Sequence, residues 1–200
     1  MPAHDTIDPA ALEGHLTETI RLLTWLRDLE RDTGAVGRLG RLLADCLHGG
    51  GRVLTCGNGG SMCDAMHFAA ELSGRYRDDR HALAAQALSD PAHLTCVGND
   101  YGFERIFARA VEALGRPGDV LVTFTTSGRS RNLLAAAEAA RAGGVRVLGL
   151  LGRDGGPLKE LCDDHIVVPG SRADHIQETH IAIAHLLVEQ IEARLFPAAR

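Results

Sequence analysis

Apolar residues along the first fifty positions recur at helical intervals and fall into two segments. The first segment starts at Asp8 and Pro9, a typical helix start, and a break near residues 33–37 separates it from the second. Three glycines at 49–51 end the second segment, as glycine commonly does at helix C-termini. We therefore predict that residues 1–50 form two helices that pack on the core or at a subunit interface.

From residue 52 onward, short continuous apolar runs alternate with helical patterns, which is typical of a parallel sheet covered on both faces. The predicted strands are 53–56, 84–88, 120–124, 145–150 and 166–168. The predicted helices are 61–72, 102–114, 130–142, a short one near 157–161, and 173–195. The expected fold class is α/β, a three-layer sandwich with a five-stranded parallel sheet flanked by helices, flavodoxin- or Rossmann-like. Residues 51–197 are expected to form one structural unit.

The amino-acid composition and net charge of the chain argue against several classes of function. The chain has 200 residues, of which 45% are hydrophobic and 24% charged, so it suits one globular domain with a buried core. The net charge of -5 and the lack of a basic block argue against a nucleic-acid or membrane-surface role. A leader and an apolar run of about 18 residues are both missing from the pattern, so we expect a cytoplasmic protein. Five widely spaced cysteines without a CxxC pair suggest reduced thiols.

The first candidate for chemistry is the glycine-rich turn after the first predicted strand. It consists of Asn58, Gly59, Gly60 and Ser61. Backbone amides at the start of a helix carry partial positive charge, so this turn favours an anion. In the helix after this turn, His67 and Glu71 are four residues apart and share a face. The stretch 57–71 therefore combines an anion cradle with two groups that can move protons or hold a metal.

A second polar turn comes after the third predicted strand. It carries four hydroxyl side chains in six positions, namely Thr125, Thr126, Ser127 and Ser130. A single hydroxyl would suggest helix capping, but four of them after a strand favour ligand binding. Ligands of parallel sheets bind outside the carboxyl ends of the strands. Neither turn has the spacing of a nucleotide-binding motif, so the expected anion is a monophosphate on a small molecule.

The last predicted helix adds a third group of polar side chains. It carries Asp174, Gln177, Glu178, His180 and His185 among apolar residues. His185 lies in the apolar run 181–188, where a histidine is more often a hydrogen-bonded core residue than a catalyst. A phosphate cradle, a carboxylate and a buried histidine together are nevertheless what proton transfer on a sugar phosphate requires.

Four blocks of the sequence resemble one known family. They read CGNGGSMCDAMHFAAELSGRYR, SDPAHLTCVGNDYGFERIF, GDVLVTFTTSGRS and ADHIQETHIAIAH. They are similar to the corresponding blocks of the phosphoheptose isomerases, a branch of the sugar isomerase (SIS) domain superfamily. The resemblance extends from about the first helix to the last. The individual turns are common to many SIS domains, but the combination of CGNGGS, HFAxEL, VGND and IQExH is specific for this branch.

The resemblance implies an activity and a set of roles. Family members convert sedoheptulose 7-phosphate to D-glycero-D-manno-heptose 7-phosphate, the first step toward nucleotide-activated heptoses. Glu71 and His185 match the acid/base pair of the family. The substrate contacts match Asn58, Gly59, Gly60, Ser61, Glu71, Asn99, Asp100, Thr125, Thr126, Ser127, Ser130 and Gln177. Some relatives hold zinc at positions that match His67, Glu71, Gln177 and His185, a donor set that suits this metal.

The expected mechanism is aldose–ketose isomerisation through a cis-enediol. One member of the pair Glu71 and His185 removes a carbon-bound proton, and the other handles the oxygen protons. The sequence leaves open which residue does which. Zinc would polarise the substrate oxygens, but Glu71 can hardly be a tight ligand and a free base at the same time. The metal-assisted and direct-base mechanisms are therefore partly competing hypotheses.

Helix geometry adds an expectation about assembly. Gln177 and His185 are eight residues apart, so about 12 Å of helix rise separates their backbones. This distance is too long for both side chains to hold one metal comfortably. We therefore expect the site to draw residues from more than one subunit, in agreement with the homotetramer of the family.

Three positions depart from the family pattern. Met62 stands where His is frequent, Thr125 where Ser is common, and Arg129 replaces a frequent Asn in the phosphate turn. Thr125 keeps a hydroxyl, whereas Arg129 could either strengthen phosphate binding or point to solvent. The loop before the last helix, GSRADH, is also about one residue shorter than in some relatives. These departures bear on substrate preference more than on reaction class.

Two alternative functions come from the same superfamily. One is a non-enzymatic SIS-domain protein that binds the replication initiator, but that relative lacks the carboxylate and the second histidine that are present here as Glu71 and His185. The other is an isomerase of a pentose or hexose phosphate, which the VGND and IQExH blocks disfavour. A sugar-phosphate sensor would be expected to keep the cradle and lose the acid/base pair.

Overall fold

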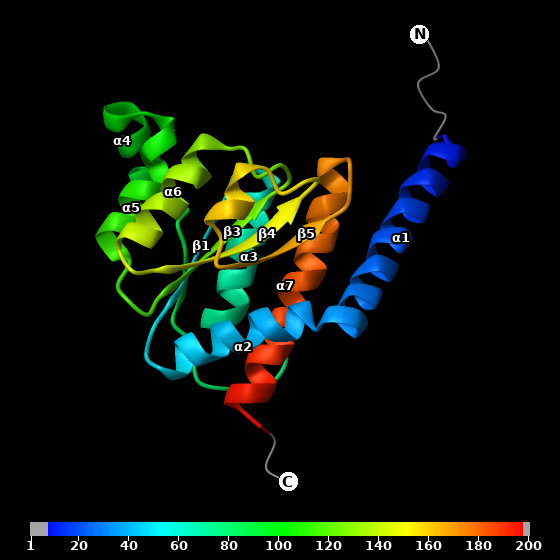
Figure 1. Ribbon diagram of the computed structural model, residues 1–200, viewed down its shortest axis with the longest axis horizontal. Coiled ribbons are helices and arrows are strands. Elements are labelled where there is room, and N and C mark those ends of the chain that lie inside the picture. Colours follow the sequence, from blue (N-terminus) through cyan, green and yellow to red (C-terminus); the bar gives the residue numbers. More distant parts are fainter. Residues whose placement is uncertain (1–7, 198–200) are drawn as a thin grey trace.

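The computed structural model describes residues 8–197 and begins with two helices (Figure 1). Asp8 caps α1 (Pro9–Thr33), because its carboxylate accepts a hydrogen bond from the Ala10 N–H at 3.0 Å. Gly34, with φ 60°, ends α1 and starts α2 (Ala35–His48). The predicted pair of N-terminal helices is confirmed, and the break between them is one residue in the left-handed region, where glycine carries no steric cost.

The sheet has five parallel strands in the order β2-β1-β3-β4-β5. The strands are β1 (Val53–Gly57), β2 (Ala85–Ala87), β3 (Val120–Thr125), β4 (Arg146–Gly152) and β5 (Asp164–Val168). All five predicted strands are present, with ends that differ by one or two residues. The predicted fold class is therefore confirmed.

The sequence analysis did not predict the helix at residues 91–101. The remaining helices are α3 (Gly60–Ser73), α4 (Pro91–Tyr101), α5 (Ile106–Leu114), α6 (Arg131–Ala142) and α7 (Ala173–Leu195), with short 3-10 turns at Phe103–Arg105 and Pro157–Leu161. The prediction of a helix over 102–114 was wrong in its start, because Gly102 has φ 87° and separates α4 from the 3-10 turn that leads into α5. Asp90 caps α4 by accepting from the His93 N–H at 2.7 Å.

Two apolar clusters fill the spaces on either side of the sheet, which makes the fold a three-layer sandwich. One face packs against α2, α3 and α7, with buried residues such as Leu39, Phe68 and Leu187, and α1 joins this cluster by packing on α7 and α2. The other face packs against α4, α5 and α6, with Phe107 and Leu133 among its buried residues. In Figure 1 the two groups of helices lie on opposite sides of the sheet.

The register of the sheet sets the position of the polar turns. Gly57, the last residue of β1, pairs with Phe124 of β3, so the turns after these two strands start side by side. Both lie at the carboxyl edge, where parallel sheets bind ligands. Within residues 8–197, the structure has no helix with the length and apolarity needed to cross a membrane.

Candidate active site

The first polar turn, after β1, leads directly into α3. Gly59 has φ 56°, and the Ser61 N–H donates to the Asn58 carbonyl at 3.1 Å. Gly60 lies close to α7, because a Cβ there would come within 2.7 Å of the Gln177 amide and would require this side chain to shift. Among the described residues, no side chain caps the start of α3. The positive end of the helix dipole is therefore available to a bound anion.

The second polar turn, between β3 and α6, uses part of its hydroxyls internally. The Thr125 hydroxyl accepts from the N–H groups of Ser127 and Gly128 at 3.3 and 3.1 Å. The Ser127 hydroxyl accepts from the Arg129 N–H at 3.3 Å. Ser130 is the N-cap residue of α6, but its side chain makes no capping hydrogen bond. Two hydroxyls thus hold the shape of the turn, and that of Ser130 is left for a ligand.

A pair of amides joins the two turns. The Asn58 side chain donates to the Asn132 Oδ1 at 3.0 Å, and Asn132 donates back to the Asn58 Oδ1 at 2.8 Å. Asn132 is 2% exposed, whereas Asn58 is half-buried. The sequence analysis missed Asn132, because an asparagine in the first turn of a helix gives no signal of a partner 74 residues away.

The predicted acid/base residues come together between α3 and α7. The His67 Nε2 lies 3.0 Å from the Glu71 Oε1 and 3.2 Å from the His185 Nε2. Each of the three side chains offers one donor atom, and these atoms lie within 4.8 Å of one another. The Tyr76 ring, which the sequence analysis did not single out, lies 5.6 Å from the His185 ring. The arrangement offers one carboxylate and two imidazoles to a substrate or a metal ion.

The expected burial of His185 needs correction. His185 is half-buried, because it lies on the side of α7 that faces α3 and its imidazole reaches His67. The buried histidine of α7 is His180, whose Nε2 lies 3.2 Å from the Leu151 carbonyl oxygen. Burial lowers the pKa of His180 to about 4, so this imidazole is neutral at pH 7. The prediction that His185 is buried, which came from the apolar run 181–188, was therefore wrong.

Asp64 is a further titratable group on α3 that the sequence analysis missed. Burial raises the pKa of its carboxyl to about 6, and the nearby His67 partly opposes this rise. Its Oδ2 is buried and has no hydrogen-bond partner within residues 8–197. Asp64 is three residues before His67, one turn away on the same helix, so its charge state influences the candidate site.

The other predicted site residues lie apart from the His67 cluster. Gln177 donates to the Ser61 hydroxyl at 3.4 Å, so it accompanies the first polar turn. Asn99 and Asp100 are exposed at the end of α4, where the Asn99 amide donates to the Asp100 carboxylate at 2.7 Å. Thr126 is half-buried in the second polar turn. Gln177 and His185 lie eight residues apart on the same helix, α7, and contact different groups.

Comparison with known proteins identifies the family. A model of the SIS domain matches residues 19–152. A phosphoheptose isomerase from Tolumonas auensis is 50% identical over 87% of this chain and 91% of its own length, and one from Fusobacterium nucleatum is 48% identical over 84% and 87%. The chain belongs to the phosphoheptose isomerase family. The solved phosphoheptose isomerase GmhA from Neisseria gonorrhoeae has a TM-score of 0.86 and 39% identity, covering 92% of this chain and 98% of its own.

The structure shows the surroundings of Arg129 and Met62, two residues that the sequence analysis expects to differ from the family pattern. Arg129, in the second polar turn, is exposed and donates to the Asp154 carboxylate at 2.6 Å. Its charge is thus partly balanced within the chain, and an exposed pair of this kind contributes little to stability. Met62 is half-buried and packs against the apolar cluster between the sheet and α4, α5 and α6.

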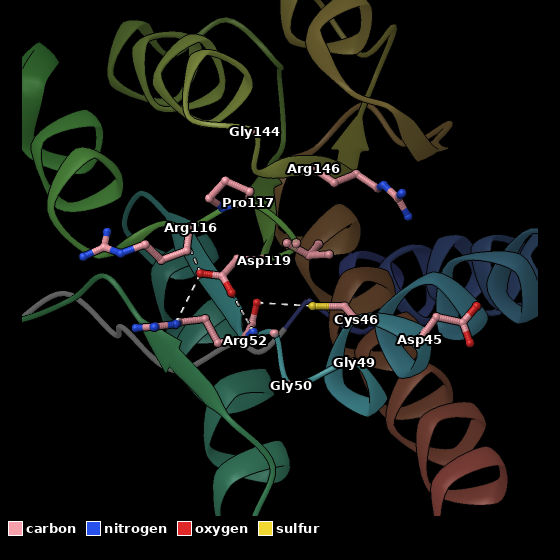
Figure 2. A pocket seen from close by; sticks show the side chains of 13 residues that line it. Asp45, Cys46, Gly49, Gly50, Arg52, Arg116, Pro117, Asp119, Gly144 and Arg146 are labelled. Atoms are coloured by element: carbon pink, nitrogen blue, oxygen red, sulfur yellow. Dashed lines mark hydrogen bonds and ion pairs between the residues drawn. The ribbon is translucent and has the colours of Figure 1, made fainter.

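A cavity of about 490 Å³ lies at the opposite, amino edge of the sheet (Figure 2). Its lining includes Arg52, Arg116, Asp119 and Arg146. Asp119 accepts hydrogen bonds from the backbone N–H groups of Arg52 and Arg116 at 2.9 and 3.0 Å. Figure 2 shows the side chains of Arg116 and Arg146 directed away from each other, so the arginines do not converge on a ligand. None of the predicted site residues lines this cavity.

Proposed function

We propose that the protein interconverts sedoheptulose 7-phosphate and D-glycero-D-manno-heptose 7-phosphate, the first step toward nucleotide-activated heptoses. The observation that carries this proposal is the cluster of His67, Glu71 and His185, which accompanies two polar turns at the carboxyl edge of one sheet. Proton transfer next to a carbonyl requires a carboxylate or imidazole within hydrogen-bond reach of the substrate. The membership of the chain in the phosphoheptose isomerase family supports the same reaction.

The two polar turns would bind the phosphate and orient the sugar. We assign phosphate binding to the amides of Gly59 and Gly60 and to the hydroxyls of Thr126, Ser127 and Ser130. The Ser127 hydroxyl accepts from the Arg129 N–H and still has its own O–H to donate. The reciprocal pair of Asn58 and Asn132 supports this assignment, since it fixes the distance between the turns. A site that is rigid before the substrate arrives loses less conformational entropy on binding.

The acid/base pair would carry the two proton transfers. In the forward direction, one member of the pair Glu71 and His185 takes a proton from C1 of the ketose, and the C2 carbonyl oxygen gains a proton, which yields the cis-enediol. The C1 hydroxyl then loses its proton while C2 gains one, which yields the aldose. The His67 Nε2 faces both residues, and as an N–H it would donate to the Glu71 carboxylate and orient it.

The same three side chains suit a zinc ion. His67, Glu71 and His185 supply two imidazole nitrogens and one carboxylate oxygen, a donor set typical of catalytic zinc. Bound zinc would polarise the substrate oxygens and stabilise negative charge on them. Gln177 lies at the first turn, so as a fourth ligand it would have to come from a partner subunit. Glu71 as a ligand would leave the proton transfer to His185.

An assembly with shared active sites, expected to be a homotetramer, is part of the proposal. Leu12, Leu16 and Ile20 of α1 are 54–65% exposed, and they recur every four residues along one side of the helix. An exposed apolar stripe of this kind is typical of an interface. We further propose that the protein works in the cytoplasm, where its five free cysteines would stay reduced.

The experiment that tests the proposed function is an NMR assay of product formation from sedoheptulose 7-phosphate. The protein is compared as purified, after chelation and after addition of zinc, with fructose 6-phosphate and ribulose 5-phosphate as competing substrates. Turnover of the heptulose phosphate alone is the expected result. Preference for another sugar phosphate would reassign the substrate, and no turnover under any condition would favour the initiator-binding alternative.

A further inference from the structure

A second group of metal-ligating side chains lies between α1 and the first turns of α7. It consists of His15 on α1 with His175 and Glu178 on α7, and we call it the His15 cluster. None of its members belongs to the His67 cluster. His175 and His185 are ten residues apart on α7, which corresponds to about 15 Å of helix rise. The His15 cluster is therefore a separate constellation.

Hydrogen bonds order the His15 cluster. The His15 Nε2 lies 2.9 Å from the Glu178 Oε1, and the His15 Nδ1 lies 3.0 Å from the His175 Nε2. A neutral imidazole has one donor and one acceptor nitrogen. If the His15 Nε2–H donates to the carboxylate, the His15 Nδ1 lone pair faces the Nε2–H of His175. One proton then occupies the space between two imidazole nitrogens, which is the place that a metal ion takes in a bis-histidine site.

A transition metal would fit once the His15 ring turns, because Glu178 and His175 face different nitrogens of that ring. One donor atom from each of the three residues lies within 4.8 Å of the others. A tetrahedral zinc ion with bonds of about 2.0 Å holds its ligands about 3.3 Å apart. The separation of 3.0 Å between the two imidazole nitrogens is already close to this value. Two imidazoles and one carboxylate leave the fourth position to water.

The surroundings of the cluster would support a cation. The His175 side chain is 5% exposed, so part of the cluster is removed from bulk water. Thr19 donates to the second oxygen of Glu178 at 2.7 Å and thereby orients the carboxylate, as outer-shell partners do in metal sites. The Asp174 carboxylate lies 4.0 Å from the His15 Nδ1, although it is also paired with Arg172. The local charge thus favours a divalent ion.

We propose that His15, His175 and Glu178 bind a divalent transition metal, zinc being the chemical fit, which clips α1 onto α7. The ion would replace the proton shared by the two imidazoles. The clip would hold the N-terminal helix against the segment that carries Gln177, next to the first polar turn. Its role is structural, because the ligands come from two helices that otherwise meet through few buried residues.

The test uses Co²⁺ and Zn²⁺ alone as probes. In the full-length chain with His67→Ala and His185→Ala, which removes the first cluster, Co²⁺ titration should give one equivalent per chain with the visible absorption of tetrahedral cobalt. His15→Ala in this background should weaken binding by more than the roughly 10–100-fold expected for Thr19→Val, which removes only an outer-shell partner. His48→Ala removes an exposed histidine outside both clusters and is the matched control.

A second measurement needs no change in the first cluster. Zn²⁺ should raise the Tm of the unmodified chain, since a ligand that binds only the folded state stabilises it. His15→Ala should reduce this rise, and His48→Ala should leave it unchanged. Absence of cobalt binding in the double variant, or binding that His15→Ala leaves unchanged, would show that the cluster is a hydrogen-bonded contact only.

Discussion

At the scale of single residues, a methyl group at Gly60 would act on the site through the Gln177 side chain. The missing Cβ of Gly60 would lie 2.7 Å from both the Nε2 and the Oε1 of Gln177. We predict that Gly60→Ala displaces the Gln177 side chain and raises KM for the sugar phosphate roughly tenfold or more, because misplaced positioning groups weaken both binding and orientation. Steady-state kinetics check this, with Gly14→Ala as control, since a Cβ there meets nothing within 4 Å.

The buried His180 should make the free energy of unfolding depend on pH. Burial lowers its pKa from 6.5 to about 4 in the folded chain. Between these pH values the unfolded state binds more protons than the folded state, so the free energy of unfolding falls as the pH drops from 6.5 toward 4. The loss is about 3 kcal/mol for a shift of this size.

The measurement is urea unfolding at pH 7 and at pH 4.5. His180→Gln should make the free energy of unfolding less dependent on pH over this window, although it also removes stability at pH 7. An equal drop for the variant and the unmodified chain would mean that other groups dominate acid unfolding.

At the scale of elements, the two polar turns act as one unit because an amide pair joins them. Asn132→Ala would leave the Asn58 amide without its partner, at a cost of about 1–3 kcal/mol if that amide stays shielded from water. We predict weaker binding of phosphate, seen as a higher inhibition constant for inorganic phosphate and a higher KM for the substrate.

The neighbouring Arg131→Ala is the matched control for this variant. Arg131 pairs with Glu104 at the surface, where both side chains are more than half exposed, so its loss should change little. Equal effects of the two variants would contradict a specific link between the turns.

Local patterns explain which elements the sequence could predict. The strands β1, β3 and β4 are continuous apolar runs, and α7 has a long helical pattern, so their existence follows from periodicity. Helix α4 was missed although its segment is about as apolar as the rest of the chain; a single residue, Val97, is buried there. Its start signal, Asp90 before Pro91, is nevertheless visible in the sequence.

The candidate site was predictable only in part, for a physical reason. His67 and Glu71 share a helix face, so their contact follows from local spacing. The approach of His185 to His67 depends on how α3 and α7 pack, and it was expected only from the family resemblance. Two residues could not be predicted from local spacing. Asn132 bonds a partner distant in the sequence, and burial raises the pKa of Asp64, so both features depend on the fold.

At the scale of the whole molecule, the exposed stripe of α1 predicts an assembly. Replacing Leu16 and Ile20 by glutamate places charges on positions that are 61% and 65% exposed in the single chain. We predict that Leu16→Glu with Ile20→Glu lowers the molar mass measured by light scattering and reduces turnover, since the proposed site needs more than one subunit. The control is Arg27→Glu, which changes an exposed charge on the same helix.

A variant that dissociates into monomers and keeps full turnover would contradict the shared site. A variant that stays assembled would place the interface on another surface.

The central claim is that Glu71 and His185 move protons on a sugar phosphate. The most direct measurement is NMR detection of deuterium incorporation at the carbon next to the carbonyl of sedoheptulose 7-phosphate in heavy water, with Glu71→Gln and His185→Gln as test variants. Glu71→Gln keeps the shape of the side chain and removes its charge. We predict exchange and product formation with the unmodified chain and a loss of both by a factor on the order of 100 to 10,000 in each variant. Exchange at the unmodified rate in both variants would contradict the account.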